Sequence, residues 1–171
     1  ELDFYESLKN RVALLQGLSL QKALDIAHNL PLMPGAKQCI KAFKNAKYKA
    51  VCFSGGFHIA TDHFANILGL DASFANILHH KDGILTGQVG GEMMFSDSKG
   101  QMLQRLQNLL HITPSETIVV GDGANDLSMF KYADTRIAFC AKEVLKKEAT
   151  LIIDTQDLTQ IPRALHIPIS H

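Results

Sequence analysis

Two hydrophobic periodicities follow one another along the chain, and they predict paired helices first and alternating strands and helices afterwards. Apolar residues recur at helical spacing over 4–15 and again over 20–30. Gly17 ends the first of these helices, and Ser19 is placed to cap the second. The pattern therefore predicts a small amphipathic helical unit that ends near Met33.

Beyond that unit, short apolar or β-branched runs alternate with amphipathic stretches. Strands are predicted at 48–53, 70–80, 84–89, 117–120, 136–140 and 151–153, and helices begin near Pro34, His58, Lys99, Leu127 and Lys142. The Asp-Gly pair at 82–83 indicates a hairpin between the second and third of these strands. This alternation predicts an α/β fold, with a largely parallel sheet covered on both faces.

The most informative turn follows the strand at 117–120. Gly121 ends this strand, and the carboxylates of Asp122 and Asp126 come directly after it. The carboxyl edge of an α/β sheet is where such folds bind ligands, and clustered carboxylates suit Mg²⁺ held together with substrate phosphate oxygens. The alternative is a plain glycine turn with a helix-capping aspartate.

A second glycine-rich turn, Ser54-Gly55-Gly56, joins the strand at 48–53 to the helix near His58. Glycines let the backbone approach an anion closely, the helix start offers free N–H groups, and the serine adds a hydroxyl. The arrangement is suited to a phosphate site, although the tripeptide alone favours an ordinary tight turn.

Isolated charged residues carry a weaker signal. Lys99 stands at a helix start, where the helix dipole disfavours a cation, and this favours a charge held there for a purpose. Arg11 lies beside the apolar stripe of the first helix, and its position alone indicates a solvated surface charge. His79 and His80 are strand neighbours that point to opposite faces, so we do not expect them to share a metal ion.

Length and composition narrow the class of protein. The 171 residues suffice for one domain with a sizeable core, and Lys plus Arg equals Asp plus Glu at 17 each, which predicts neither a nucleic-acid nor a membrane partner. Cys39, Cys52 and Cys140 lack metal or disulfide spacing and resemble buried thiols of a reducing compartment. No apolar stretch approaches the roughly 20 residues of a membrane span, and no targeting signal is recognisable, so we expect a cytoplasmic protein.

Three motifs, FSGGF at 53–57, SKG at 98–100 and GDGANDLSMF at 121–130, together resemble phosphatases of the haloacid dehalogenase superfamily. Further matches are LDFYESLKNRVALLQGL at 2–18, LPLMPGA at 30–36, FAN at 74–76, DGILTG at 82–87 and IAFCAK at 137–142. The resemblance implies a Rossmann-like, doubly wound, mostly parallel sheet with a small helical cap and a β-hairpin. Residues 1–33 would form part of the cap and residues 34–171 the α/β core.

The same resemblance implies a role for each matching residue around a phosphate. Asp122 would bind Mg²⁺ and Asp126 would support that metal site. Ser54 and the backbone N–H of Gly55 would hold phosphate oxygens, while Lys99 would neutralise charge between the phosphate and a nucleophile. A transferring phosphoryl group needs this kind of positioning and neutralisation above all.

The remaining implied contacts concern the substrate. Asn125 would steady the phosphate, Arg11 would pair with a substrate carboxylate, and Phe4 would help to close the pocket. A bidentate guanidinium suits the carboxylate of an amino acid. The implied activity is Mg²⁺-dependent hydrolysis of a small phosphorylated amino acid, with O-phospho-L-serine as the first candidate. The reaction would pass through an aspartyl-phosphate, and it would belong to serine biosynthesis. The sequence leaves the oligomeric state open.

One feature departs from the family, because no Asp-x-Asp motif occurs in these residues. In the family, that motif ends a central strand and supplies the nucleophile and the acid/base. We therefore expect an N-terminally truncated and inactive chain, with an unfilled gap between the strands at 48–53 and 117–120. Two alternatives stay open: a non-catalytic phosphate-binding or regulatory fragment, and an enzyme that transfers the phosphoryl group to another alcohol.

Overall fold

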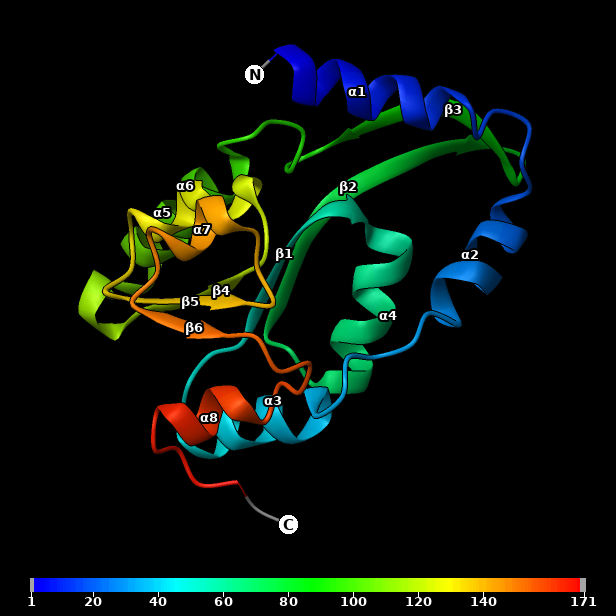
Figure 1. Ribbon diagram of the computed structural model, residues 1–171. Helices are drawn as coiled ribbons and strands as arrows, with labels where there is room; N and C mark the ends of the chain where they lie inside the picture. Colours follow the sequence, from blue (N-terminus) through cyan, green and yellow to red (C-terminus); the bar gives the residue numbers. More distant parts are fainter. Residues whose placement is uncertain (1, 170–171) are drawn as a thin grey trace.

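The computed structural model describes residues 2–169, with side chains from residue 4 onward, and consists of helices packed around two small sheets (Figure 1). The helices are α1 (Leu2–Ala13), α2 (Leu20–His28), α3 (Ala36–Asn45), α4 (His58–Leu68), α5 (Ser98–Leu110), α6 (Leu127–Phe130), α7 (Glu143–Lys146) and α8 (Gln160–Ala164). The strands are β1 (Val51–Phe57), β2 (Ala72–Lys81), β3 (Ile84–Gly91), β4 (Ile118–Gly121), β5 (Thr135–Phe139) and β6 (Leu151–Ile153).

The sheets confirm the predicted α/β class with mostly parallel pairing. One sheet has the order β1-β2-β3 and the other the order β4-β5-β6. Each adjacent pair is parallel except β2 and β3, which form the predicted antiparallel hairpin. Asp82 and Gly83 at its tip have φ angles of 50° and 76°, the left-handed conformation that a two-residue hairpin turn requires.

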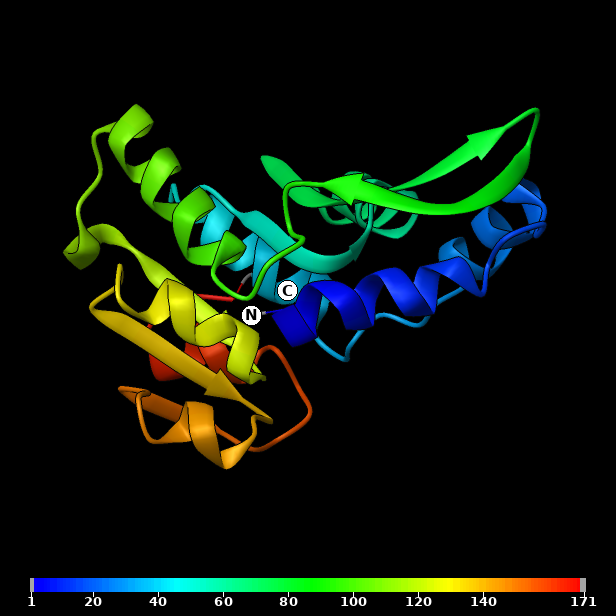
Figure 2. The ribbon, with the colours of Figure 1, turned by 90° about the horizontal axis from the view of Figure 1, so that it is seen from above.

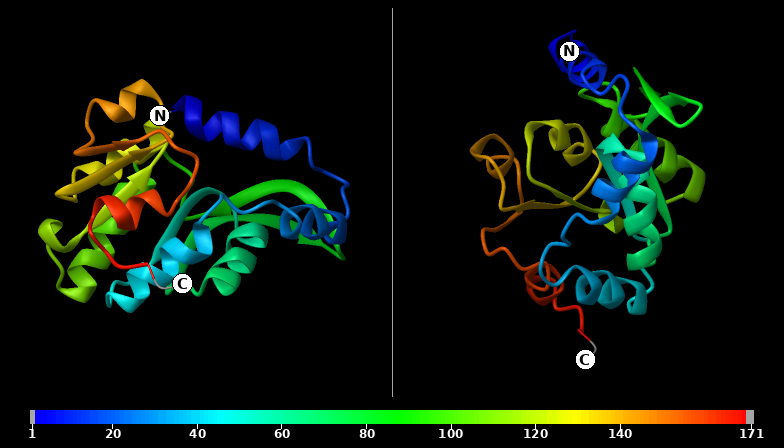
Figure 3. Two further views of the ribbon diagram at one scale, coloured as in Figure 1. Left: turned by 60° about the horizontal axis from the view of Figure 1, so that its bottom comes forward. Right: turned by 90° about the vertical axis from the view of Figure 1, so that its right-hand side faces the viewer.

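Apolar residues on both faces of the second sheet explain how its helices are held. Val119 packs with Leu103 of α5 and Met129 of α6 on one face, while Ile137 and Ile153 pack toward α3 and α8 on the other. Figure 3 shows α3 and α8 side by side at one end of the molecule. The β4-β5-β6 sheet is therefore covered by helices on both sides, as alternating strands and helices predict.

The N-terminal helices lie against the hairpin. Leu8 and Val12 of α1 are buried with Leu78 of β2 and Leu85 of β3, and Figures 1 and 2 show α1 running along the hairpin. Ser19 occupies the predicted position before α2, but its side chain makes no capping hydrogen bond. Within residues 2–169, no helix combines the length and the apolar character that a membrane span needs.

The two sheets are not paired with each other in the described chain. In the described chain β1 pairs only with β2, and β4 pairs only with β5, so each strand leaves one edge without a partner. No residue of β1 is fully buried, and Val120 of β4 is 40% exposed although it is apolar. Side chains of strands inside a helix-covered sheet are normally more buried than this. Backbone groups of such strands are also normally paired on both edges.

Strand β1 differs from the prediction in one way that matters for function. It begins three residues later than expected and runs through Ser54-Gly55-Gly56, which was predicted as a turn beyond the strand. Phe53 pairs with Phe74 and Phe57 pairs with Asn76, so three residues of β1 stand opposite one residue of β2. The glycine-rich segment is therefore a bulge within a paired strand, which holds it more firmly than a free loop.

Replacing Gly100 with alanine tests how closely α5 and α6 approach. A Cβ at Gly100 would lie 2.7 Å from the carbonyl carbon of Ser128 and 2.9 Å from its Cβ. A glycine-to-alanine change inside a helix normally stabilises a protein, but here we expect a loss of about 1–3 kcal/mol from overpacking. Chemical denaturation measures the free energy of unfolding. Gln104→Ala, at an exposed position of the same helix, is the control, and a stabilised Gly100→Ala variant would contradict the close approach.

Candidate active site

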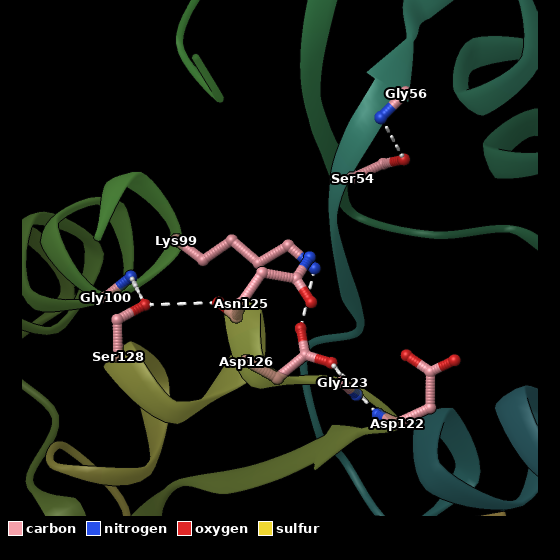
Figure 4. A network of polar contacts seen from close by, with 9 residues as sticks. All are labelled: Ser54, Gly56, Lys99, Gly100, Asp122, Gly123, Asn125, Asp126 and Ser128. Atoms are coloured by element: carbon pink, nitrogen blue, oxygen red, sulfur yellow. Dashed lines mark hydrogen bonds and ion pairs between the residues drawn. The ribbon is translucent and has the colours of Figure 1, made fainter. Parts of the chain in front are cut away.

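The bulge within β1 presents a serine hydroxyl and glycine backbone in the second half of the strand. The backbone N–H of Gly56 donates a hydrogen bond of 3.0 Å to Oγ of Ser54 (Figure 4). The glycines leave this stretch of backbone open, since the nearest atom to a Cβ built on Gly55 is Cζ of Phe4, 3.8 Å away. The segment thus combines an oriented hydroxyl with uncrowded backbone, which suits an anion.

A buried ion pair joins α5 to the acidic turn. Nζ of Lys99 lies 2.6 Å from Oδ1 of Asp126, and the two side chains are 12% and 4% exposed. The other carboxylate oxygen, Oδ2, accepts hydrogen bonds from the backbone N–H groups of Asp122 (2.9 Å) and Gly123 (3.2 Å). Both oxygens of Asp126 are therefore engaged, and its carboxylate holds the backbone of the turn and the side chain of Lys99 in place.

Gly121 makes this arrangement possible. A Cβ at this position would lie 2.5 Å from Cβ of Asp126 and 2.6 Å from its Oδ2. No side chain fits in that space, so the glycine that ends β4 lets the Asp126 carboxylate fold back over the turn.

Asp122 has the opposite environment to Asp126. It is exposed, and within residues 2–169 its carboxylate makes no hydrogen bond or ion pair. Figure 4 shows the carboxylate projecting away from that of Asp126. Its backbone is fixed by the N–H group bonded to Asp126 and by a carbonyl that accepts from Lys142 N at 2.9 Å. A free carboxylate on a fixed backbone can bind a cation without first breaking another interaction.

Lys99 also lies close to strand β1. Burial raises the pKa of the Cys52 thiol, and the positive charge of Lys99 partly opposes that rise. Cys52 precedes Ser54 by two residues on β1. The charge of Lys99 therefore acts on β1 as well as on the acidic turn after β4, and Figure 4 shows Ser54, Lys99 and Asp122 in one region of the molecule.

Asn125 is held beside Lys99 through its backbone. Oγ of Ser128 donates to the Asn125 carbonyl at 3.4 Å and accepts from the Gly100 N–H at 3.1 Å. The serine thus connects the first turn of α5 to the acidic turn. The Asn125 side chain itself makes no hydrogen bond with the described residues, and Figure 4 shows it next to Lys99.

Helix α1 covers this region with aromatic rings. The Phe4 ring lies over Gly55 at the distance given above, and the Tyr5 ring stacks on Phe95 with centroids 5.3 Å apart and planes inclined by 16°. Arg11 is exposed on the same helix, where its Nε donates to the Ser7 carbonyl at 3.2 Å. The structure thus brings Phe4 to the bulge, while Arg11 makes no hydrogen bond or ion pair with the other predicted site residues.

Two features of this region escaped sequence reasoning. One is Asn76, a buried side chain that bonds to the bulge; its only signal is the FAN motif that marks the resemblance. The other is the Tyr5–Phe95 stack, which joins residues ninety positions apart (95 minus 5). Neither follows from local periodicity, because both depend on how distant segments meet.

Comparison with known proteins places these features in a family. A haloacid dehalogenase-like hydrolase model matches residues 2–134. The chain is similar to phosphoserine phosphatases of Wolinella succinogenes (59% identity over 160 residues, 94% of this chain and 78% of the relative) and Methanocaldococcus jannaschii (44% over 161 residues, 94% and 76%).

Solved structures of phosphoserine phosphatases have the same fold as this chain. A phosphoserine phosphatase described as a phospho-aspartyl intermediate analogue has a TM-score of 0.91 and 43% identity, covering 95% of this chain and 78% of that one. A substrate-bound phosphoserine phosphatase complex matches with the same values. Sequence, fold and the motifs around Lys99 agree, and the chain belongs to the haloacid dehalogenase-like hydrolases.

Proposed function

We propose that this hydrolase removes the phosphate from O-phospho-L-serine with the help of Mg²⁺. The observation that carries the proposal is the convergence of Ser54, Lys99 and Asp122 from three separate segments. An anion-binding bulge, a buried cation and a free carboxylate together suit a phosphate bound beside a metal ion. The relatives named phosphoserine phosphatase support the choice of this substrate.

At the phosphate, each group has a separate task. The Ser54 hydroxyl and the Gly55 backbone N–H donate to phosphate oxygens. Lys99, held by Asp126, places its positive charge beside the transferring group, and Asn125 steadies the phosphate from the acidic turn. A preformed set of donors costs no reorganisation when charge develops in the transition state.

The metal would bind at Asp122. The described residues contain no group of three His, Cys, Asp or Glu side chains that could enclose an ion. Mg²⁺ fits nonetheless, because it is commonly held by one or two carboxylates with waters and substrate phosphate oxygens. When bound, it would supply charge neutralisation at the phosphoryl oxygens. Asp126 would support the site indirectly, since its oxygens already bind Lys99 and the backbone.

At the other end of the substrate, the helical cap of residues 1–33 would provide recognition. The Arg11 guanidinium has five N–H donors, and among the described residues only its Nε is engaged, with the Ser7 carbonyl. The others remain for the substrate carboxylate. Phe4 would close the pocket over the phosphate, in keeping with its position above Gly55.

We infer that the nucleophile lies outside these 171 residues, which contain no Asp-x-Asp pair. We propose that it ends a strand inserted between β1 and β4. Both strands have a free edge on the described chain, and the exposure of Val120 leaves apolar surface for such a strand to cover. A carboxyl end at this position would bring an aspartate between Ser54, Lys99 and Asp122.

Phosphate release from O-phospho-L-serine tests the proposal. The full-length protein, with the proposed nucleophile strand, should release inorganic phosphate with Mg²⁺ and lose activity when the metal is chelated. The 171-residue chain alone should be slower by on the order of a millionfold, the effect of losing a covalent nucleophile. No metal-dependent release by the full-length protein, or transfer to an added alcohol in preference to water, would refute it.

Asp122→Asn in the full-length protein should lower kcat/KM by about a hundredfold or more. The amide keeps the shape but loses the charge that binds the metal, and a metal acting as a Lewis acid contributes several kcal/mol. Steady-state kinetics at several Mg²⁺ concentrations measure the effect. Asp134→Asn is the control, because Asp134 is exposed and lies before the start of β5. Unchanged metal dependence in Asp122→Asn would place the metal elsewhere.

Arg11→Ala should lower kcat/KM for O-phospho-L-serine by about tenfold to a hundredfold, the usual effect of losing a charge-assisted hydrogen bond. O-phosphoethanolamine has no carboxylate, so its hydrolysis should change little. The ratio of the two kcat/KM values separates recognition of the carboxylate from general damage. Arg105→Ala, at an exposed position of α5, is the control, and equal losses for both esters would exclude Arg11 from the substrate site.

A further inference from the structure

The FAN motif at 74–76 has no role in the proposed function, yet its asparagine is among the most buried polar residues of the molecule. Asn76 is 0% exposed and pairs with Phe57 across the sheet, next to the bulge in β1. We propose that Asn76 is a positioning residue, which fixes the Ser54 hydroxyl as a hydrogen-bond donor to the phosphate. The inference rests on the proposed phosphate-binding role of Ser54.

Asn76 uses its whole amide to connect two segments of the site. Its Nδ2 donates to the carbonyl oxygens of Gly55 (3.2 Å) and Met93 (3.1 Å), and its Oδ1 accepts from the Met93 N–H (2.9 Å). Met93 belongs to the segment between β3 and α5, six residues before Lys99 (99 minus 93). A buried side chain with these three bonds cannot reach substrate, but it holds both the bulge and the approach to the lysine.

The contact with the bulge passes to Ser54 through a single peptide group. The carbonyl of Gly55 and the N–H of Gly56 belong to one planar unit, so fixing the carbonyl also fixes the direction of the N–H. That N–H donates to Oγ of Ser54 at 3.0 Å. Asn76 therefore determines, through this peptide, which side of the serine oxygen receives a hydrogen bond.

The direction of this hydrogen bond decides what the serine can do. Because Oγ already accepts from Gly56, its own hydrogen points elsewhere, and no acceptor among the described residues takes it. A hydroxyl in this state is a ready donor for a phosphate oxygen. If the Gly55–Gly56 peptide turned, the serine would lose the bond that orients it and with it the preformed donor.

Close packing around Asn76 keeps the arrangement rigid. A Cβ at Gly91 would lie 2.7 Å from Cα of Asn76, and Gly91 has a φ of 128°, which side chains rarely adopt. The backbone of β3 therefore approaches Asn76 more closely than any other residue type would allow. The Asn76 amide, enclosed by this backbone, faces the carbonyls of Gly55 and Met93.

A merely structural asparagine would behave differently, and Gln107 provides the comparison. Gln107 is 6% exposed, and its Nε2 donates to Oγ1 of Thr117 (2.8 Å) and to the Tyr132 carbonyl (2.7 Å). It is thus also a buried amide with two donor bonds, but it lies toward the far end of α5. Loss of either amide should lower stability, whereas only loss of Asn76 should alter the phosphate site.

The test measures inhibition by inorganic phosphate and steady-state kinetics in the full-length protein for Asn76→Ala, Ser54→Ala, the double variant and Gln107→Ala. Asn76→Ala should weaken phosphate inhibition and raise KM by about fivefold to tenfold, the usual effect of losing one oriented hydrogen bond. In the Ser54→Ala background, removing Asn76 should have little further effect, because both changes remove the same donor. Gln107→Ala should lower the melting temperature and leave phosphate inhibition unchanged.

Independent, multiplying losses in the double variant would overturn the inference, as would unchanged phosphate inhibition in Asn76→Ala. If that variant does not fold, amide hydrogen exchange decides the matter: the Gly56 N–H should be protected in the unsubstituted protein and lose protection in Ser54→Ala. Rapid, unprotected exchange of the Gly56 N–H in the unsubstituted protein would refute the proposed link from Asn76 to Ser54. Failure of phosphate to inhibit the unsubstituted protein would instead count against the proposed function.

Discussion

The ion pair between Lys99 and Asp126 determines the arrangement of the whole site. Burying two charges costs several kcal/mol each unless they are paired and hydrogen-bonded. The structure meets this condition, since Asp126 also accepts two backbone N–H groups and Gly121 leaves room for its carboxylate. The same interaction fixes the start of α5, the turn that carries Asp122 and the position of a positive charge beside β1. Loss of either partner would leave an unpaired buried charge.

The sequence predicted which residues form this site better than it predicted how their side chains are arranged. Lys99, Asp122 and Ser54 lie in motifs that occur in a fixed order, and the elements around them follow from periodicity. The bulge in β1 was predicted as a turn, because glycine marks both a turn and a strand that bends. The partners of Asp126 and Asn76 come from segments distant in sequence, so no local pattern could identify them. The resemblance supplied residue types, and only the structure shows which oxygen faces which donor.

The apolar cores explain how the fold is stabilised although each sheet has an unpaired edge. Each has its own apolar core: α1 and the hairpin bury Leu8 and Leu85, while α5 and α6 bury Leu103 and Met129 against β4. Both cores form without a strand in the space between the free edges of β1 and β4. The connection between the two halves is partly apolar, since Phe53 of β1 packs against the cluster of Leu103 and Met129, and Asn76 ties the bulge in β1 to the segment that leads into α5.

Helix α1 is attached differently at its two ends. Leu8 and Val12 are buried in the hairpin core, whereas the N-terminal turn contacts the site through aromatic rings, with Tyr5 against Phe95. An aromatic pair contributes about 0.5–1.5 kcal/mol beyond the area it buries, far less than a packed core. Tyr5 also packs against the hairpin core, so the ring pair extends the packing of α1 to Phe95, in the segment that leads from β3 to Lys99.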